Sequence, residues 1–527
     1  MDRRLRLCLV NVDAPLVEAF EALGHEVLLL MPASGTTPNL PKLLAANKFE
    51  PDAVIQQELL GPRVLLAGLE DVPGLRAFWA RDPHLNAYWQ APYARLFDVT
   101  FSTQEHAIPA LAACGAEHIV PLPWFAPSRP FRPHKQRARA AGFAGRLGPT
   151  RPVRAWLAEC MRGLLGEGFA LVEDLSFEAM LDFYMDCRMV PNESLAGEVN
   201  FRLFEAAGCG CVVLGQNLGP AQEALFTPGR EMLVCGDSLE LAGAVAMLEK
   251  RPHLAEALGH AAWTRVQAEH LPASRAREML KTLDETPRTA PRATALAGAP
   301  EARGWFLLAS AGLMEAGRLK ITEKALAASQ ADLAALPVQD ELALTAQVRV
   351  ASLSKDPKVA AEVYARVVAQ CERLAGGGDA LVSLRLALAC AMLALRQGLR
   401  PILAAKGSAG KDAAARDLAG QGEWLARALA LSARAGVDVS PENPPEALLM
   451  AWARRLEGAG LPARGGFPFE PGQHLPATPG ECLYWAAALA PNDVIVLRAL
   501  ADHLAAVPGA DALLLGALSE LGLRQTQ

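Results

Sequence analysis

Three arginines, Arg146, Arg151 and Arg154, fall within nine residues of the segment GRLGPTRPVRAW, where a short apolar strand gives way to a helix. Arginine holds phosphate oxygens with a planar fork of N–H groups, and the start of a helix adds its own positive dipole. The spacing therefore predicts a clamp for a diphosphate. A solvated basic rim has the same composition, and this alternative stays open on the sequence alone.

A second group of polar residues lies in GEVNFRLFEAAGCG, residues 197–210. A helix over 198–207 would place Glu198, Arg202 and Glu205 on one face, because these positions are four and three residues apart. A stripe of salt bridges facing solvent has the same spacing. The helix runs directly into the apolar strand CVVLG, which favours packing on a sheet with the polar face at its edge. A carboxylate in that place can accept both hydroxyls of a ribose.

The first part of the chain offers further polar candidates in loops. Asp13 follows the first apolar strand in NVDAP, so it faces a ligand if the sheet has the usual order. Asp82 and His84 stand together in ARDPHLNAYW, where an imidazole can act as a base toward an acceptor or as an electrostatic stabiliser. A histidine bonded to nearby backbone is the structural alternative. His106, after FSTQE, is a further candidate for a surface between domains.

Short apolar strands alternate with helices through the first half of the chain, a pattern typical of doubly wound α/β domains. Residues 1–35 show the pattern of strand, helix and strand, and apolar strands recur at 52–60, 97–103 and 118–123. A second alternating series begins at 141–147. The pattern predicts two Rossmann-like domains, 1–135 and 136–284, with a ligand-binding cleft between them.

The rest of the chain shows no strand pattern. Residues 285–303 are rich in proline, threonine and alanine and are interpreted as a linker. Residues 304–527 have helical periodicity in segments of hairpin length. The segment ECLYWAAALAPNDVIVLRALADHLAAV is similar to a tetratricopeptide repeat, although no fixed period of about 34 residues is maintained. The sequence predicts an all-α, repeat-like domain here, with a plain helical bundle as the alternative.

Composition narrows the classes of function and location. The chain has 527 residues, of which 51% are hydrophobic and 20% charged, and its net charge is −6. Because no overall positive field is available, neither nucleic acid nor anionic lipid is expected as a partner. The ten cysteines are scattered, several of them in apolar runs, which is typical of reduced, buried residues. No stretch has the length of an apolar membrane span, and we expect a cytoplasmic protein.

The two polar segments together resemble a known family. FAGRLGPTR with the downstream FEAAGCGCVVL is similar to the donor-binding half of group 1 glycosyltransferases of the B-type fold. PNESLAGEVNFRLFEAAGCG with DPHLNAYWQAPYARLFDVTFSTQ resembles the CgeB-like branch of such enzymes. The resemblance covers roughly residues 1–285 and leaves out the helical part. It implies that Arg146 and Arg151 bind the diphosphate of a nucleotide sugar and that Glu205 binds its ribose.

The motif of the family is incomplete at one position. Its pattern has another glutamate, in contact with the donor sugar, eight residues before the ribose carboxylate, and this chain has Gly197 there. Glu198 follows directly, and Glu193 stands four residues earlier. The resemblance leaves open which of the two glutamates replaces the missing one. If neither does, the catalytic arrangement differs or the activity has been lost.

Two more residues belong to the CgeB-like pattern. The resemblance implies that Asn200 hydrogen-bonds the sugar or caps the helix. It implies that Arg202 neutralises the leaving diphosphate or only pairs with Glu198 and Glu205. Whether the sugar is transferred with inversion or with retention stays open, because the residue that would indicate retention has moved.

These features predict a glycosyltransferase, of hexosyltransferase type, that moves a sugar from a nucleotide sugar to a protein or glycan acceptor. Asp13, His84 and Glu198 are the candidate catalytic residues, and the nucleotide sugar is a substrate rather than a cofactor. No aspartate pair suited to Mg²⁺ is evident, so no metal is expected. The helical domain is expected to bind the acceptor or a partner protein. The alternatives are a non-catalytic scaffold with this fold and a nucleotide-sugar epimerase.

Overall fold

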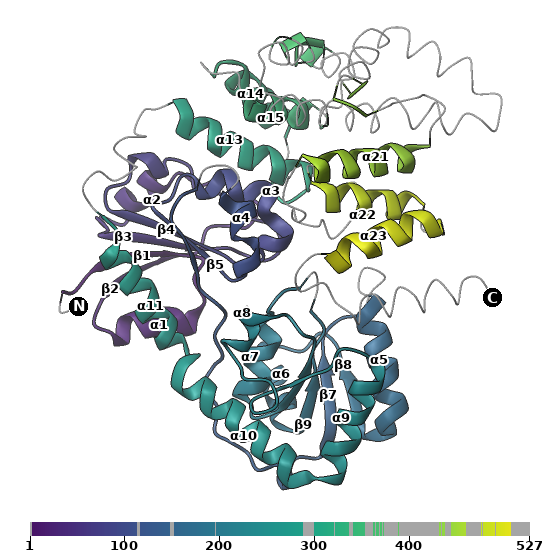
Figure 1. Cartoon of the computed structure of the whole chain (residues 1–527). Helices are drawn as coiled ribbons and strands as arrows, with labels where there is room; N and C mark the ends of the chain where they lie inside the picture. Colours follow the sequence, from purple (N-terminus) through teal and green to yellow (C-terminus); the bar gives the residue numbers. More distant parts are fainter. Residues whose placement is uncertain are drawn as a thin grey trace.

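Two parallel β-sheets, each covered by helices, occupy the chain up to α11, and further helices follow (Figure 1). The computed structural model describes residues 3–112, 116–147, 152–194, 197–287, 300–320, 322–336, 341–351, 444–459, 478–490 and 492–506, with isolated positions between 353 and 476. The prediction of two Rossmann-like domains is confirmed by these sheets.

The first sheet contains six parallel strands in the order β2-β1-β3-β4-β5-β6. Their bounds are β1 Arg6–Val10, β2 Glu26–Leu30, β3 Ala53–Gln57, β4 Leu75–Ala80, β5 Val99–Ser102 and β6 Ile119–Pro121. The helices of this domain are α1 Ala14–Ala22, α2 Leu40–Ala46, α3 Pro83–Ala94 and α4 Ile108–Ala112. The strand order reverses between β1 and β3, so the loops that follow these strands form the edge where such sheets bind ligands.

Strand β4 is missing from the sequence prediction, and its charged residue explains why. The segment LRAFWA carries Arg76, which argues against a buried strand. In the structure Arg76 Nε and Nη2 donate to the Asp98 carboxylate, each at 3.1 Å, and Nη1 donates to the Leu69 carbonyl at 3.2 Å. Because these hydrogen bonds satisfy the buried guanidinium of Arg76, β4 can lie in the interior of the sheet.

The second sheet contains five parallel strands in the order β11-β10-β9-β7-β8. Their bounds are β7 Arg139–Ala144, β8 Phe169–Val172, β9 Cys187–Pro191, β10 Val212–Gly215 and β11 Leu233–Val234. The helices that follow the chain here are α5 Pro152–Leu165, α6 Phe177–Met185, α7 Phe201–Gly208, α8 Pro220–Glu223, α9 Ser238–Lys250, α10 Pro252–Glu269 and α11 Pro272–Glu285. The order reverses between β7 and β9, which marks the ligand-binding edge of this sheet.

The chain passes between the two domains twice, and the two crossings are bonded to each other. The first crossing is the segment 122–138, and the second lies between α10 and α11, at His270. Ala126 N donates to the His270 carbonyl at 2.9 Å, and the buried Arg275 Nε donates to the Pro123 carbonyl at 2.8 Å. The two crossings therefore form one hinge region.

Helix α11 lies inside the range predicted for the second domain, but it packs on the first. Its residues Met279, Leu280 and Leu283 are buried in one core with Leu16 and Phe20 of α1, and Figure 1 shows the two helices side by side. The apolar face of α11 thus completes the cover of the first sheet. A helix that follows a domain in sequence need not belong to it.

The helical part begins in direct contact with the first domain. Helix α13 packs on α3, and at Gly312 an added Cβ would lie 3.1 Å from the Tyr88 ring, so glycine allows the close approach. The helices beyond the second crossing are α13 Pro300–Glu315, α14 Glu323–Ala334, α15 Glu341–Ala351, α21 Pro445–Gly458, α22 Pro479–Leu489 and α23 Val494–Ala506. The helical character is confirmed, while the repeat resemblance stays a prediction. Most of the predicted linker, 288–299, lies outside the described residues.

Two predictions about covalent and membrane features can be compared with the structure. All seven cysteines in the described part of the chain are free, as expected for a reduced protein. Among the helices of that same part, none is both long and apolar enough to span a bilayer.

Candidate active site

The loop after β1 carries Asp13 to the ligand-binding edge of the first sheet. Asp13 N donates to Gln57 Oε1 at 2.9 Å, and Gln57 Nε2 donates to the Asp13 carboxylate at 2.6 Å. The same carboxylate lies 3.6 Å from Arg81 Nη2. Asp13 is therefore held at the end of β3 and helps to orient Arg81, whose guanidinium lies 4.4 Å from the centroid of the Trp124 ring.

The loop before Asp13 reaches its conformation without glycine. Asn11 directly follows β1 with φ of 56°, in the left-handed region that asparagine tolerates better than most residues. Its side chain is buried, and neither its oxygen nor its nitrogen has a hydrogen-bond partner. The segment NVDAP contains no glycine, and an asparagine adopts the glycine-like conformation instead.

Glu58, directly after β3, organises the loop that carries the candidate histidine. Its buried carboxylate accepts hydrogen bonds from Arg81 N at 2.8 Å, Asp82 N at 3.3 Å and Gln90 Nε2 at 2.6 Å, and lies 3.0 Å from Arg63 Nε. Burial raises the pKa of Glu58, Arg63 opposes the rise and Asp82 adds to it. Sequence reasoning missed Glu58, although an acid at the end of a buried strand is a signal that could have found it.

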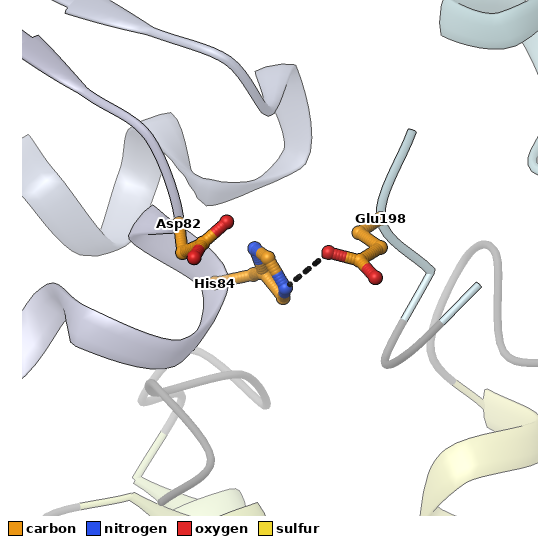
Figure 2. Close-up of side chains that lie close together, drawn as sticks. All are labelled: Asp82, His84 and Glu198. Atoms are coloured by element: carbon orange, nitrogen blue, oxygen red, sulfur yellow. Dashed lines mark ion pairs between the residues drawn. The ribbon is translucent and has the colours of Figure 1, made fainter. Parts of the chain in front are cut away.

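Asp82, His84 and Glu198 meet where the two domains face each other, and we call them the interdomain triad. His84 lies in the first turn of α3, two residues after the N-cap position Asp82, and its side chain is 1% exposed. His84 Nε2 lies 3.2 Å from Glu198 Oε2, and Figure 2 shows the imidazole between the two carboxylates. One ligand-type atom from each of the three residues lies within 4.8 Å of the others.

Burial and neighbouring charges shift the pKa of Asp82 in the interdomain triad. Burial raises the pKa of Asp82, Glu198 raises it further, and His84, Arg81 and Arg63 oppose the rise. Neither ring nitrogen of His84 has a hydrogen-bond partner, since the contact with Glu198 has ion-pair distance without hydrogen-bond geometry. The structural alternative of a histidine bonded to neighbouring backbone is therefore not what the structure shows.

Glu198 reaches His84 because α7 begins later than predicted. The helix starts at Phe201, with Asn200 as its N-cap, so Glu198 precedes it in an extended segment. Asn200 Oδ1 accepts from Leu203 N at 3.4 Å, and its Nδ2 donates to the Glu193 carbonyl at 2.7 Å. The prediction that Glu198 shares one helical face with Arg202 and Glu205 is wrong. Asn200 caps the N-terminus of α7, so the helix begins after Glu198 and does not include it.

A glutamine of the first domain holds that extended segment in place. Gln104, just after β5, accepts from Val199 N at 2.8 Å and donates to the Val199 carbonyl at 3.0 Å. All four atoms are buried, and the two bonded residues are 95 positions apart in the sequence. This pair of hydrogen bonds therefore fixes the neighbouring Glu198 opposite His84. His106, two residues after Gln104, has its ring centroid 6.2 Å from that of His84.

Two guanidinium groups flank Gly145 at the ligand-binding edge of the second sheet. An added Cβ at Gly145 would lie 3.2 Å from Arg202 Nη2 and 3.5 Å from Arg154 Nη1. Arg202 stacks on Phe143, with 4.3 Å from guanidinium to ring centroid, and its Nη1 donates to Asn192 Oδ1 at 3.3 Å. The strand end is thus bare backbone between two positive charges.

Glu205 is buried near the charges of Arg202 and Arg81. Burial raises its pKa to about 7, and the nearby charges of Arg202 and Arg81 oppose the rise. One carboxylate oxygen, Oε2, is buried without a hydrogen-bond partner. A buried polar atom of this kind is costly unless a ligand satisfies it, so Glu205 has the features of a binding residue.

The arginine loop is divided between solvent and interior. The Arg146 side chain is 81% exposed and its Nε lies 2.7 Å from Asp174 Oδ1, while Arg151 lies outside the described residues. Arg154 is half-buried, and its Nε and Nη2 both donate to Glu193 Oε2, at 3.0 and 2.8 Å. Since Arg154 engages Glu193, it is Glu198 that faces the first domain.

The second domain is similar in sequence to a known family. Residues 137–281 match the family model described as glycosyl transferase-like. The match covers the arginine loop, Arg202 and Glu205, so it supports the group 1 resemblance for this glycosyl transferase-like domain. The CgeB-like subtype stays a prediction. No curated protein matches the sequence.

Solved glycosyltransferase structures are similar to the chain over about half of its length. Sucrose-phosphate synthase from Thermosynechococcus elongatus is 13% identical with a TM-score of 0.39, and covers 54% of this chain and 99% of its own. A glycosyltransferase from Rickettsia africae is 10% identical with a TM-score of 0.40, and covers 55% and 100%. HepE from Anabaena, in complex with UDP and glucose, is 14% identical with a TM-score of 0.37, and covers 54% and 100%.

Proposed function

We propose that the protein is a glycosyltransferase that moves a sugar, of hexose type, from a nucleotide sugar to a protein or glycan acceptor. The observation that carries the proposal is the match of residues 137–281 to the glycosyl transferase-like model, a range that includes Arg154, Arg202 and Glu205. The interdomain triad adds groups from the first domain to that edge.

The second domain supplies the groups for a donor. Glu205 offers an unpartnered, buried oxygen to the hydroxyls of a ribose, which are hydrogen-bond donors. Arg202 and Arg154 flank the bare backbone at Gly145, where a diphosphate would be neutralised on two sides. Arg146 and Arg151, the pair implied by the family resemblance, remain candidates for the same diphosphate.

The first domain supplies the groups for the acceptor. In the transfer, a bond forms between the acceptor oxygen and the anomeric carbon, and the bond from that carbon to the diphosphate breaks. His84 takes the proton of the acceptor hydroxyl at Nε2, in the tautomer that leaves this nitrogen without a proton, because Nε2 has no hydrogen-bond partner in the described part of the chain. Glu198 contacts the donor sugar in place of the missing glutamate, and Asp13 orients Arg81.

The leaving nucleoside diphosphate needs compensation for its growing negative charge. Arg202, stacked on Phe143 and bonded to Asn192, is preorganised to provide it without moving. These arginines supply the positive charge that a metal provides in other transferases, so the proposed reaction is metal-independent. The helical domain binds the acceptor or a partner protein, in the cytoplasm.

A non-catalytic scaffold is the competing function, and two observations favour it. Gly197 replaces a glutamate of the family pattern, and Arg146 is paired with Asp174 at the surface. A scaffold of this kind binds no nucleotide sugar, whereas an epimerase interconverts one without an acceptor.

A thermal-shift screen against UDP-, GDP-, dTDP- and ADP-sugars separates these functions. A ligand at about 100 times its dissociation constant adds about 2.7 kcal/mol to the free energy of unfolding. The proposal expects stabilisation by one nucleotide family that is lost in Glu205→Ala and Arg202→Ala and kept in the exposed control Glu18→Ala. Absence of any shift would overturn donor binding and leave the scaffold.

A further inference from the structure

The interdomain triad has a property that sugar transfer does not require. It combines one imidazole nitrogen with carboxylate oxygens from two residues, at one point, from two domains. We propose that Asp82, His84 and Glu198 form a binding site for a divalent transition-metal ion that bridges the two domains. The ligand set suits Zn²⁺, Co²⁺ and Mn²⁺, which accept imidazole and carboxylate together.

The distances require little rearrangement. Ligands bonded to Zn²⁺ at about 2.0–2.2 Å in a tetrahedron lie about 3.3–3.6 Å from one another. His84 Nε2 and Glu198 Oε2 already stand 3.2 Å apart. The three ligand atoms all lie within 4.8 Å of one another, so the Asp82 oxygen has to approach by at most about 1.5 Å. A rotation of the Asp82 side chain covers such a distance.

His84 gives the independent sign of a missing partner. Its side chain is 1% exposed and sits between the two carboxylates, yet both ring nitrogens lack a hydrogen bond. A buried imidazole without partners is costly. A cation bonded to Nε2 gives this nitrogen the partner that it lacks among the described residues.

The charges around the interdomain triad also favour a cation. Asp82 forms no ion pair with a described lysine or arginine, and Arg63 and Arg81 are engaged by Glu58 and Asp13 respectively. The two carboxylates repel each other, since Glu198 adds to the rise in the pKa of Asp82. A divalent cation removes their mutual repulsion and links α3 of the first domain to the segment before α7 of the second.

Occupation of the site has a consequence for the transfer, and this consequence alone rests on the proposed function. A metal ion bound at His84 Nε2 prevents that nitrogen from accepting a proton. The ion and the acceptor hydroxyl then exclude each other, so the cation acts as an inhibitor. Binding of the ion itself requires no activity and is tested without any.

The test is titration of the purified, metal-free full chain with CoCl₂, followed by its visible absorption, and with ZnCl₂ by calorimetry. The proposal expects one ion per chain in the wild type. In His84→Ala and Glu198→Gln the dissociation constant should rise about tenfold or more, as metal sites lose at least this much when a supporting group is removed. Asp82→Asn should show the same loss, and the exposed control His253→Ala should bind like the wild type.

Folding of the variants is checked by their circular dichroism and thermal unfolding in the absence of metal. Variants that fold like the wild type and bind Co²⁺ with unchanged affinity would overturn the site, as would a wild type that binds neither ion. If His84→Ala does not fold, Glu198→Gln and Asp82→Asn decide the question. Loss of metal binding in these variants, with metal-free unfolding like that of the wild type, supports the site. Absence of donor binding in the wild type refutes only the proposed function.

Discussion

Replacement of Glu205 by glutamine should make the free protein more stable and a poorer binder. Burial raises the pKa of this carboxyl from 4.5 to about 7, which corresponds to about 3 kcal/mol against the ionised form in the folded state. Glutamine keeps the shape and removes the charge. At pH 8 the carboxylate is ionised in both the folded and the unfolded state. We therefore expect the free energy of unfolding of Glu205→Gln to be about 3 kcal/mol higher than that of the wild type.

The sign of the pH dependence makes the prediction specific. Between pH 4.5 and about 7 the folded state binds the proton that the unfolded state has released, so the stability of the wild type falls as pH rises through this window. At pH 5 the advantage of Glu205→Gln should shrink to less than about 1 kcal/mol. Urea unfolding of both proteins at pH 5 and pH 8 measures it, with the exposed Glu18→Gln as the control.

Two results would refute this reasoning. If Glu205→Gln is less stable than the wild type at pH 8, then Arg202 and Arg81 stabilise the carboxylate by more than burial costs. A stability difference that does not change with pH would show that Glu205 titrates outside the expected window. The variant should also bind the nucleotide sugar more weakly, because the carboxylate is the stronger acceptor for ribose hydroxyls.

Three further substitutions probe the site. Arg202→Lys keeps the charge but loses the planar stacking on Phe143, and calorimetry with the nucleotide sugar should show a dissociation constant raised about tenfold. Gly145→Ala places a methyl group 3.2 Å from the Arg202 guanidinium and should weaken the same binding to a similar extent, whereas unchanged affinity would exclude a diphosphate there. Gln104→Leu leaves the buried Val199 N–H and carbonyl unpaired, so the free energy of unfolding should fall by about 1–3 kcal/mol and the turnover number should fall more than the donor KM changes.

The sequence was sufficient for the alternation of strands and helices but not for every strand. Apolar runs and glycine stops predicted both doubly wound domains. The pattern failed at β4, where the buried Arg76 is tolerated because Asp98, directly before the neighbouring strand β5, accepts its hydrogen bonds. It also could not show that α11 packs on α1, since an amphipathic helix does not encode which domain it covers.

The candidate residues were found by type, while their grouping required the fold. His84 and Glu198 were both candidates, yet 113 positions separate them and no spacing rule joins them. The residue at which α7 begins determines which side chain Glu198 contacts. A helix from 198 would have placed Glu198 beside Arg202, whereas the N-cap at Asn200 leaves Glu198 outside the helix and near His84. Glu58 and Gln104 were missed because their roles lie in buried hydrogen bonds to other segments.

The paired crossings at Ala126 and His270 make the second domain an insertion within the first. The chain leaves the first domain after β6, builds the whole second sheet, and comes back through α11 and α13 to finish the unit it had left. A single tether would let the second domain swivel freely, whereas two adjacent tethers joined by Arg275 restrict it to bending about one axis. The second domain could therefore be replaced as one unit, and the two crossings would keep the ligand-binding edge of its sheet turned toward the same face of the first domain.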